Sequence, residues 1–154
     1  MTAEPMEIEI IVSGGDWSNL PDAASFCARV LQAAADAEQA QGSVVAMLSD
    51  DAMLRQLNRD WRGKDQATNV LSFPAAQNGD GFLGDIALAF ETVRAEAEAQ
   101  DKAFDAHVAH LLVHGFLHLL NYDHDRDEDA ARMEARETAI LHALGYPDPY
   151  RDHA

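Results

Sequence analysis

The feature that most constrains the fold is the segment FDAHVAHLLVHGFLHLLN (104–121), which is apolar nearly all round when drawn as a helix. A helix without a polar face has no side to turn toward water, so the rest of the chain must cover it. We therefore predict that this segment forms a central, buried helix.

The remaining segments alternate between strand and helix patterns. Short alternating or β-branched runs predict strands at 6–12, 43–49, 70–74 and 82–90. Amphipathic or alanine-rich runs predict helices at 20–39, 51–61, 91–100 and 127–145. This order predicts an α+β fold, in which a small mixed four-stranded sheet packs with helices in one domain over residues 1–154.

Two local features refine these elements. Ser49 or Asp50 is expected to cap the helix at 51–61. The apolar stripe of this helix is expected to comprise Met53, Leu54, Leu57 and Trp61.

The composition points to a cytoplasmic protein with no membrane partner. No stretch approaches eighteen uninterrupted apolar residues, which excludes a transmembrane helix. The first residues carry acids where a signal peptide has a basic region. The single cysteine, Cys27, lies on an apolar helical face and is expected to be a buried, inert thiol.

The charge is unfavourable for general attraction to nucleic acid, because the net charge is −16. However, four of the eleven basic residues fall within ten positions, namely Arg55, Arg59, Arg62 and Lys64. Such a confined basic patch can hold a phosphodiester. From charge alone, a solvated helix face with acidic partners fits equally well, and for Arg55 a surface salt bridge is the favoured interpretation.

The motif HGFLHLLNYDH (114–124) predicts a metal site. His114 and His118 lie one turn apart on one helical face, so two imidazole nitrogens can converge on one ion. Asn121 tolerates the left-handed conformation that turns the chain back, and His124 follows as a third ligand. Three imidazoles with an open fourth position are typical of catalytic zinc.

Two other interpretations of the histidines are weaker. Hydrogen bonding to backbone would explain any one buried histidine, but it does not explain three at this spacing. A ligand set that includes His107 and His110 is disfavoured, because a straight helix separates residues i and i+8 by about 12 Å. We expect His110 to be an outer partner of the site or a group on the substrate side, and His107 to be a surface residue at the helix start.

The spacing H-x3-H-x5-H is also that of metzincin proteases, but Gly115 stands where those enzymes carry their glutamate base. A metal site of this kind therefore need not cut peptides. Asp85 and Asp123 are the available carboxylates, and orienting a histidine is the commoner role for a neighbour such as Asp123. The sequence leaves open whether either acts as a base.

With WRGKDQATNVLSFP (61–74), LGDIALAF (83–90) and the histidine motif in this order, the chain resembles the YbeY family of bacterial metal-dependent endoribonucleases. The resemblance covers nearly the whole chain, including the closing MEARETAILHALGYPDPY. The clear departure is Asn121, where the family usually has glycine.

The resemblance implies a single-domain α+β fold and one zinc ion held by His114, His118 and His124. It implies hydrolysis of single-stranded RNA in 3′-end maturation of small-subunit ribosomal RNA and in ribosome quality control. The partners it implies are the ribosome or its small subunit, a ribosomal protein and an assembly GTPase. The functional arginine of the family falls on Arg62.

Elementary chemistry agrees with that arginine, because a guanidinium can stabilise the charge that develops on a phosphodiester during hydrolysis. Arg59 and Lys64 are expected to guide the RNA backbone, and the edge strand VLSF, with Ser72, is expected to contact the substrate. The alternatives are a metalloprotease-like hydrolase and a non-catalytic ribosome-assembly factor with a structural metal.

Overall fold

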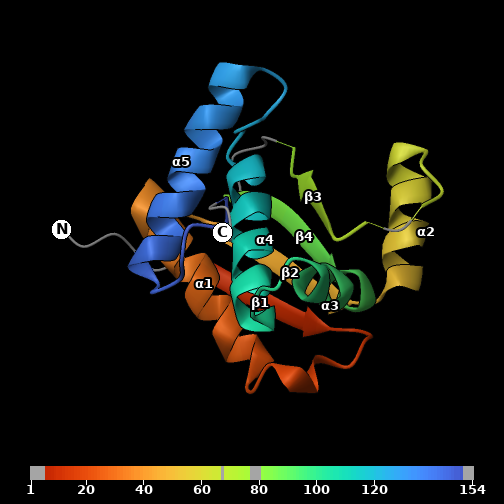
Figure 1. Cartoon of the computed structure of the whole chain (residues 1–154). Helices are drawn as coiled ribbons and strands as arrows, with labels where there is room; N and C mark the ends of the chain where they lie inside the picture. The colour runs from red at the N-terminus through yellow and green to blue at the C-terminus, as the bar shows by residue number, and fades with distance from the viewer. Residues whose placement is uncertain (1–5, 67, 77–80, 151–154) are drawn as a thin grey trace.

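The computed structural model describes residues 6–66, 68–76 and 81–150 (Figure 1). Its strands are β1 (Glu7–Val12), β2 (Ser43–Ser49), β3 (Val70–Pro74) and β4 (Phe82–Ala89). Its α-helices are α1 (Ala23–Glu38), α2 (Asp51–Arg62), α3 (Phe90–Ala99), α4 (Phe104–Leu119) and α5 (Asp127–Ala143). A short 3-10 helix, η1 (Trp17–Asn19), precedes α1. Every predicted strand and helix is therefore present.

The strands form one sheet in the order β1-β2-β4-β3. β1, β2 and β4 run parallel, whereas β3 pairs antiparallel with β4 and forms one edge of the sheet. The predicted mixed four-stranded sheet is thus confirmed. The prediction that one domain extends over residues 1–154 includes residues outside the described ranges and stays a prediction.

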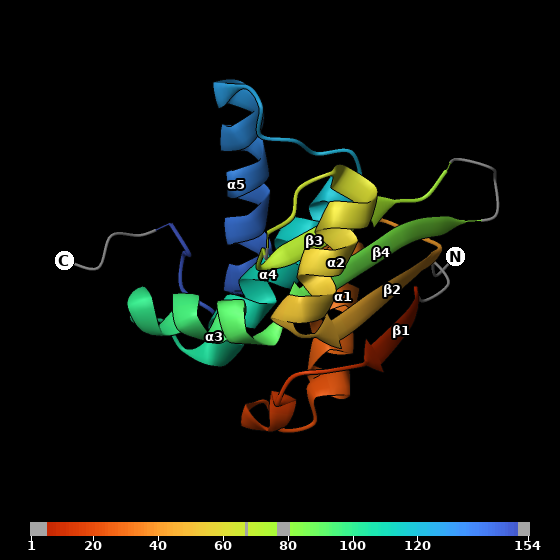
Figure 2. The ribbon, with the colours of Figure 1, turned by 90° about the vertical axis from the view of Figure 1, so that its right-hand side faces the viewer.

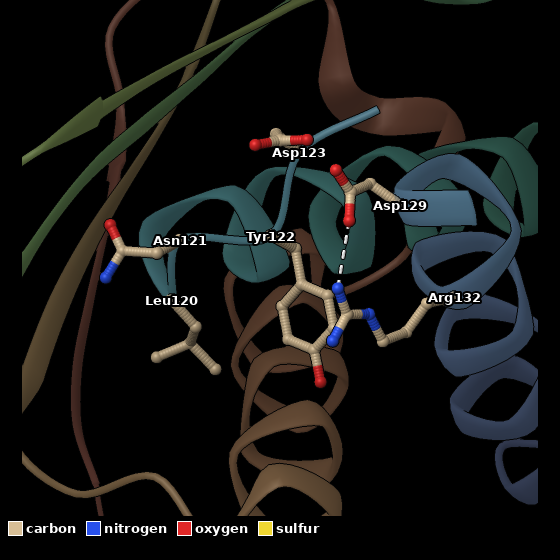
Figure 3. A pocket seen from close by; sticks show the side chains of 6 residues that line it. All are labelled: Leu120, Asn121, Tyr122, Asp123, Asp129 and Arg132. Atoms are coloured by element: carbon tan, nitrogen blue, oxygen red, sulfur yellow. Dashed lines mark hydrogen bonds and ion pairs between the residues drawn. The ribbon is translucent and has the colours of Figure 1, made fainter. Parts of the chain in front are cut away.

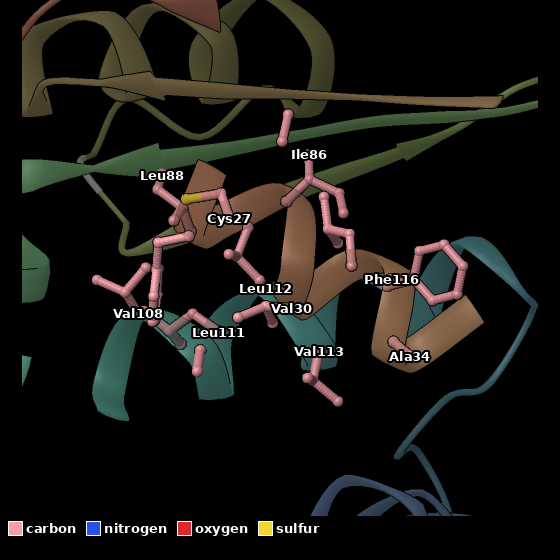
Figure 4. Packing of buried hydrophobic residues seen from close by; sticks show 14 of the residues in the cluster. Cys27, Val30, Ala34, Ile86, Leu88, Val108, Leu111, Leu112, Val113 and Phe116 are labelled. Atoms are coloured by element: carbon pink, nitrogen blue, oxygen red, sulfur yellow. The ribbon is translucent and has the colours of Figure 1, made fainter. Parts of the chain in front are cut away.

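Helices cover the two faces of the sheet unequally. α1 and α4 pack on one face, α2 lies on the other, and α5 packs against α1 and α4 (Figures 1 and 2). The larger core lies between the sheet and α1 and α4, where Cys27, Val30, Ile86, Leu112 and Phe116 meet (Figure 4). The α+β class predicted from the pattern is confirmed.

α4 is the central buried helix that its apolar sequence predicts. Ten of its sixteen residues are buried, and it contacts α1, α3, α5, β3 and β4. Cys27 is also buried, as expected, and burial raises the pKa of its thiol to about 12. No helix in the described chain combines the length and the apolar character needed to cross a membrane.

Of the two predictions made for α2, the cap is confirmed and part of the apolar stripe is wrong. The Asp50 side chain caps the helix by accepting a hydrogen bond from the Met53 backbone N–H at 2.9 Å. Leu54 is buried, but Trp61 is 73% exposed, so its assignment to the apolar stripe is wrong. The reason is that in the described chain α2 alone covers this face of the sheet, which leaves the indole at the rim of an open groove.

Candidate metal centre

Three histidines meet where α4 ends. His114 and His118 project from successive turns of α4, and their Nε2 atoms lie 3.1 Å apart. The ring of His124 lies 5.7 Å from that of His114 and 5.2 Å from that of His118, centroid to centroid. One nitrogen from each of the three lies within 4.8 Å of the others.

The turn that returns His124 to the site begins directly after α4. Asn121 adopts a left-handed conformation with φ of 74°, as the sequence predicts. The Tyr122 backbone N–H donates to the Leu117 carbonyl at 3.1 Å and closes the turn. Figure 3 shows Asn121, Tyr122 and Asp123 following the helix end, beside an ion pair of α5 between Asp129 and Arg132.

A carboxylate of α1 anchors this turn to the body of the protein. The Tyr122 hydroxyl donates to Glu38 Oε1 at 2.6 Å, and Arg136 of α5 also binds Glu38. The turn is therefore held from two helices, which fixes the backbone that precedes His124.

Hydrogen bonds at Nδ1 orient the two histidines of α4. His118 Nδ1 donates to the Tyr122 carbonyl at 3.0 Å, and His114 Nδ1 donates to Glu137 Oε2 at 3.3 Å. In each ring the proton sits on Nδ1, which leaves the Nε2 lone pair free to bind a metal. Burial lowers the pKa of His118, and the nearby His114 and His124 lower it further, which keeps the imidazole neutral.

Glu137 of α5 is the outer partner that the sequence interpretation missed. Its side chain is fully buried, and its Oε1 accepts hydrogen bonds from His110 Nε2 at 2.6 Å and from the Tyr150 hydroxyl at 2.8 Å. Burial raises the pKa of Glu137, but the hydrogen bonds from His110 and His114 outweigh it and bring the pKa to about 2. Glu137 is therefore a carboxylate that ties α5 to α4.

The donor set fits a zinc-type ion. Two nitrogen ligands of a tetrahedral zinc ion, each about 2.0–2.1 Å from the metal, lie about 3.3–3.4 Å apart. The observed 3.1 Å between the Nε2 atoms of His114 and His118 is close to that value. The carboxylate and the carbonyl behind these rings match the outer partners of catalytic zinc sites. The same nitrogens also suit other first-row metals.

An open cleft of about 440 Å³ adjoins the three histidines, and Arg62 and Ser72 also line it. The Arg62 guanidinium donates from Nη2 to the Ser72 carbonyl at 2.8 Å and lies over the Phe73 ring, 5.6 Å from its centroid. These two contacts fix the guanidinium at the rim of the cleft, where its other N–H groups can meet a ligand.

Close packing between α4 and the sheet explains Gly115. The Ser72 hydroxyl donates to the Gly115 carbonyl at 3.2 Å. A Cβ at position 115 would lie 2.9 Å from Ser72 Oγ and 3.0 Å from Ile86 Cγ2. The position that carries the glutamate base in metzincins therefore faces the sheet here and has no room for a side chain.

Gly115→Ala is expected to destabilise the protein by about 1–3 kcal/mol, because overpacking a filled core forces side chains and backbone to shift. Urea unfolding followed by circular dichroism measures the change. The higher helix propensity of alanine opposes it by about 1 kcal/mol. A variant more stable than the wild type would contradict the close packing described above.

The comparisons with known proteins assign the family. A family model described as Endoribonuclease YbeY matches residues 16–145. The chain belongs to the YbeY family. Two curated relatives named Endoribonuclease YbeY come from Bradyrhizobium sp. strain BTAi1 and Rhizobium meliloti strain 1021. The first is 51% identical over 94% of this chain and 92% of its own length, and the second is 50% identical over 99% and 98%.

A solved structure supports the fold independently. A Thermotoga maritima protein determined in solution matches with a TM-score of 0.62, covering 94% of this chain and 99% of its own. Its sequence identity is 21%, so the likeness concerns the fold alone. The family predicted from the sequence motifs is confirmed, and so is membership in a family of endoribonucleases.

The basic residues expected at the site differ in where the structure places them. Only Arg62 reaches the cleft. Arg59 is exposed and pairs with its neighbour Asp60 at 3.4 Å, and Lys64 is exposed on the loop after α2. Arg55 forms the expected surface salt bridge, with Asp65 at 2.7 Å.

Asp85 lies away from the site, whereas a role for Asp123 stays a prediction. Asp85 points to the opposite face of the sheet, because side chains alternate along β4 and Ile86 faces α4. Asp123 is exposed at the rim of the cleft, where it accepts from the Asp125 backbone N–H at 3.4 Å. In the described chain the partners of the histidines are instead Glu137 and the Tyr122 carbonyl.

Two further histidines of α4 lie beside the site. His110 and His114 both donate to Glu137, so His110 lies two hydrogen bonds away from His114. The expectation of a surface position for His107 is wrong, because this residue is 4% exposed and its Nε2 bonds to Glu96 at 2.9 Å. α3 and α4 pack together here, which buries the start of α4.

Proposed function

We propose that this chain is a zinc-dependent endoribonuclease that hydrolyses single-stranded RNA. The observation that carries the proposal is that His114, His118, His124 and Arg62 line one open cleft. Membership in the YbeY family supports a nuclease, and the three imidazoles support a catalytic rather than a closed structural zinc site.

Arg62 has the geometry for stabilising a phosphodiester. When bound, zinc supplies Lewis-acid chemistry, because it polarises a phosphoryl oxygen and acidifies water. The Arg62 guanidinium is held by the Ser72 carbonyl and the Phe73 ring, so its remaining donors can bind the non-bridging oxygens as their charge increases. Arg59 and Lys64 are exposed, on α2 and on the loop after it, and guide the RNA backbone toward the cleft.

The proposed substrate is the 3′ region of small-subunit ribosomal RNA, both during maturation and in quality control of ribosomes. The proposed partners are the ribosome or its small subunit, a ribosomal protein and an assembly GTPase. The net charge of −16 supports contacts with basic ribosomal proteins more than indiscriminate RNA binding. Ribosomal RNA as substrate implies action in the cytoplasm.

Two other functions are less well supported. A protease would need a general base near the metal, and the position that carries it in metzincins is the glycine packed against the sheet. A purely structural metal in an assembly factor is disfavoured by the open cleft beside the three histidines.

The function is tested with purified, zinc-loaded protein on single-stranded RNA, on duplex RNA, on ribosomal precursor particles and on a peptide library. Cleavage of single-stranded RNA and of the precursor 3′ end is expected. Peptide cleavage without RNA cleavage would replace the proposal with the protease, and no cleavage of any substrate would favour the assembly factor.

Arg62→Glu is expected to reduce kcat for RNA cleavage by about 10²–10³-fold, because the variant removes a preorganised donor and adds a repulsive charge. Zinc content, measured by plasma emission, is expected to stay at the wild-type value. Arg55→Glu on the same helix is the matched control, since Arg55 pairs with Asp65 at the surface. Equal loss in both variants would mean that Arg62 acts only through overall charge.

A further inference from the structure

A second cavity lies beside the metal cleft. This side pocket has a volume of about 380 Å³, and its walls include Asn69, Val70, Glu96, His107, His110 and Tyr150. It shares Asn69, Val70 and His114 with the metal cleft, so the two cavities follow the same edge strand, β3. A strand of RNA that runs from the histidines along β3 toward Asn69 would therefore pass over the side pocket.

The side pocket contains acceptors that the described chain leaves free, beside the donors of Asn69, Gln100 and Lys102. Glu96 Oε1 accepts from Asn69 Nδ2 and from His107 Nε2, each at 2.9 Å, and Oε2 has no partner in the described chain. The Nδ1 atoms of His107 and His110 are buried and unpartnered. Each of these rings donates from Nε2 to a carboxylate, and burial lowers the pKa of His107, so Nδ1 of His107 carries a lone pair.

The charges in the side pocket favour a base over a phosphate. Glu96 contributes a carboxylate, and the Lys102 ammonium, which also lines the pocket, offsets its charge and directs one N–H group to the Pro149 carbonyl at 2.9 Å. Val70 and Leu111 supply apolar walls, and Tyr150 supplies an aromatic ring. Unpaired RNA bases are recognised by this combination of an aromatic or apolar surface with hydrogen bonds to the Watson–Crick edge.

We propose that the side pocket binds one unpaired nucleobase of the RNA substrate, next to the phosphodiester in the metal cleft. Glu96 Oε2 accepts N–H groups from the Watson–Crick edge of that base. Guanine fits best, because its N1–H and N2–H groups both donate. Uracil fits worst, because two carbonyl oxygens flank its single N–H and face the carboxylate. This inference rests on the proposed function.

A binding experiment tests the pocket apart from catalysis. Zinc-loaded protein is titrated with guanosine and with uridine, which lack a phosphate and so report on the base alone. Guanosine is expected to bind about tenfold more tightly than uridine, the size of a good hydrogen-bonded base contact. Glu96→Gln replaces an acceptor with a donor and is expected to remove that preference.

Two further variants make the result specific. Glu98→Gln carries the same charge change on an exposed side chain of α3 and is expected to keep the preference. Gln100→Trp adds bulk at an exposed position of the pocket wall and is expected to abolish guanosine binding without altering Glu96, because a nucleoside without a phosphate binds through the pocket alone. Equal binding of guanosine and uridine by the wild-type protein would overturn the proposal.

A cleavage experiment separates this inference from the proposed function. A uridine-rich single-stranded RNA with one guanosine is expected to be cut mainly beside that guanosine, and Glu96→Gln is expected to spread the cuts. Cleavage without such a bias would overturn the side pocket and leave the nuclease in place. A guanosine preference that depends on Glu96, with no RNA cleavage, would support the pocket and contradict the nuclease.

Discussion

His124→Ala is expected to abolish metal binding while leaving the metal-free fold intact. His124 is exposed on the loop after α4, and its ring lies against the rings of His114 and His118. Two remaining imidazoles bind zinc far more weakly than three, so the loss exceeds the 10–100-fold that removal of an outer partner produces. Zinc content should fall from one ion per chain to almost none, and RNA cleavage should fall with it.

Plasma emission measures the zinc, and thermal unfolding in a chelator compares the metal-free proteins. His142→Ala is the matched control, because His142 is exposed near the end of α5 and outside the cleft. Zinc retained at one ion per chain in His124→Ala would show that the ligand set is wrong.

Glu137→Ala is expected to lower the free energy of unfolding by about 3–4 kcal/mol and to weaken zinc binding about 10–100-fold. The substitution leaves donors of His110, His114 and Tyr150 without an acceptor in a buried site. Denaturant unfolding measures the first effect and competition with a zinc chelator the second. Glu134→Ala, one turn earlier on α5, is the control.

The same carboxylate predicts a pH dependence. The pKa of Glu137 is lowered from 4.5 to about 2 in the folded state, so its stabilisation is fully present above about pH 4.5 and is lost as the pH falls toward 2. In metal-free protein, the stability difference between wild type and Glu137→Gln should therefore be constant above pH 4.5 and shrink below it. A difference that does not change between pH 4.5 and pH 2 would contradict the hydrogen bonds assigned to Glu137.

Local sequence patterns predicted the strands, the helices and the convergence of the three histidines, because each of these depends on short-range spacing. The turn at Asn121 could be predicted for the same reason, since left-handed geometry at a helix end is a local property. Asp85 and Trp61 were misassigned because their surroundings depend on which face of the sheet each helix covers. No local pattern states that, within the residues the structure describes, α2 alone packs on the second face.

Glu137 was missed although the sequence carries a signal for it. Met133, Glu137, Ile140 and Leu141 are spaced as one buried face of α5. A glutamate in such a stripe is almost never buried without a partner. The stripe does not tell which partner Glu137 meets, because tertiary packing decides which faces of α4 and α5 meet.

The link between Glu137 and His114 makes helix docking and metal binding thermodynamically reciprocal. If the docking of α5 raises the affinity for zinc by a given free energy, bound zinc stabilises the docking of α5 by the same free energy. A bound metal would then also stabilise the position of α5, and its removal is expected to loosen the docking of this helix against α4. Conversely, a ligand that draws Glu137 away from His114 is expected to weaken metal binding about 10–100-fold without contacting any of the three histidines of the metal site.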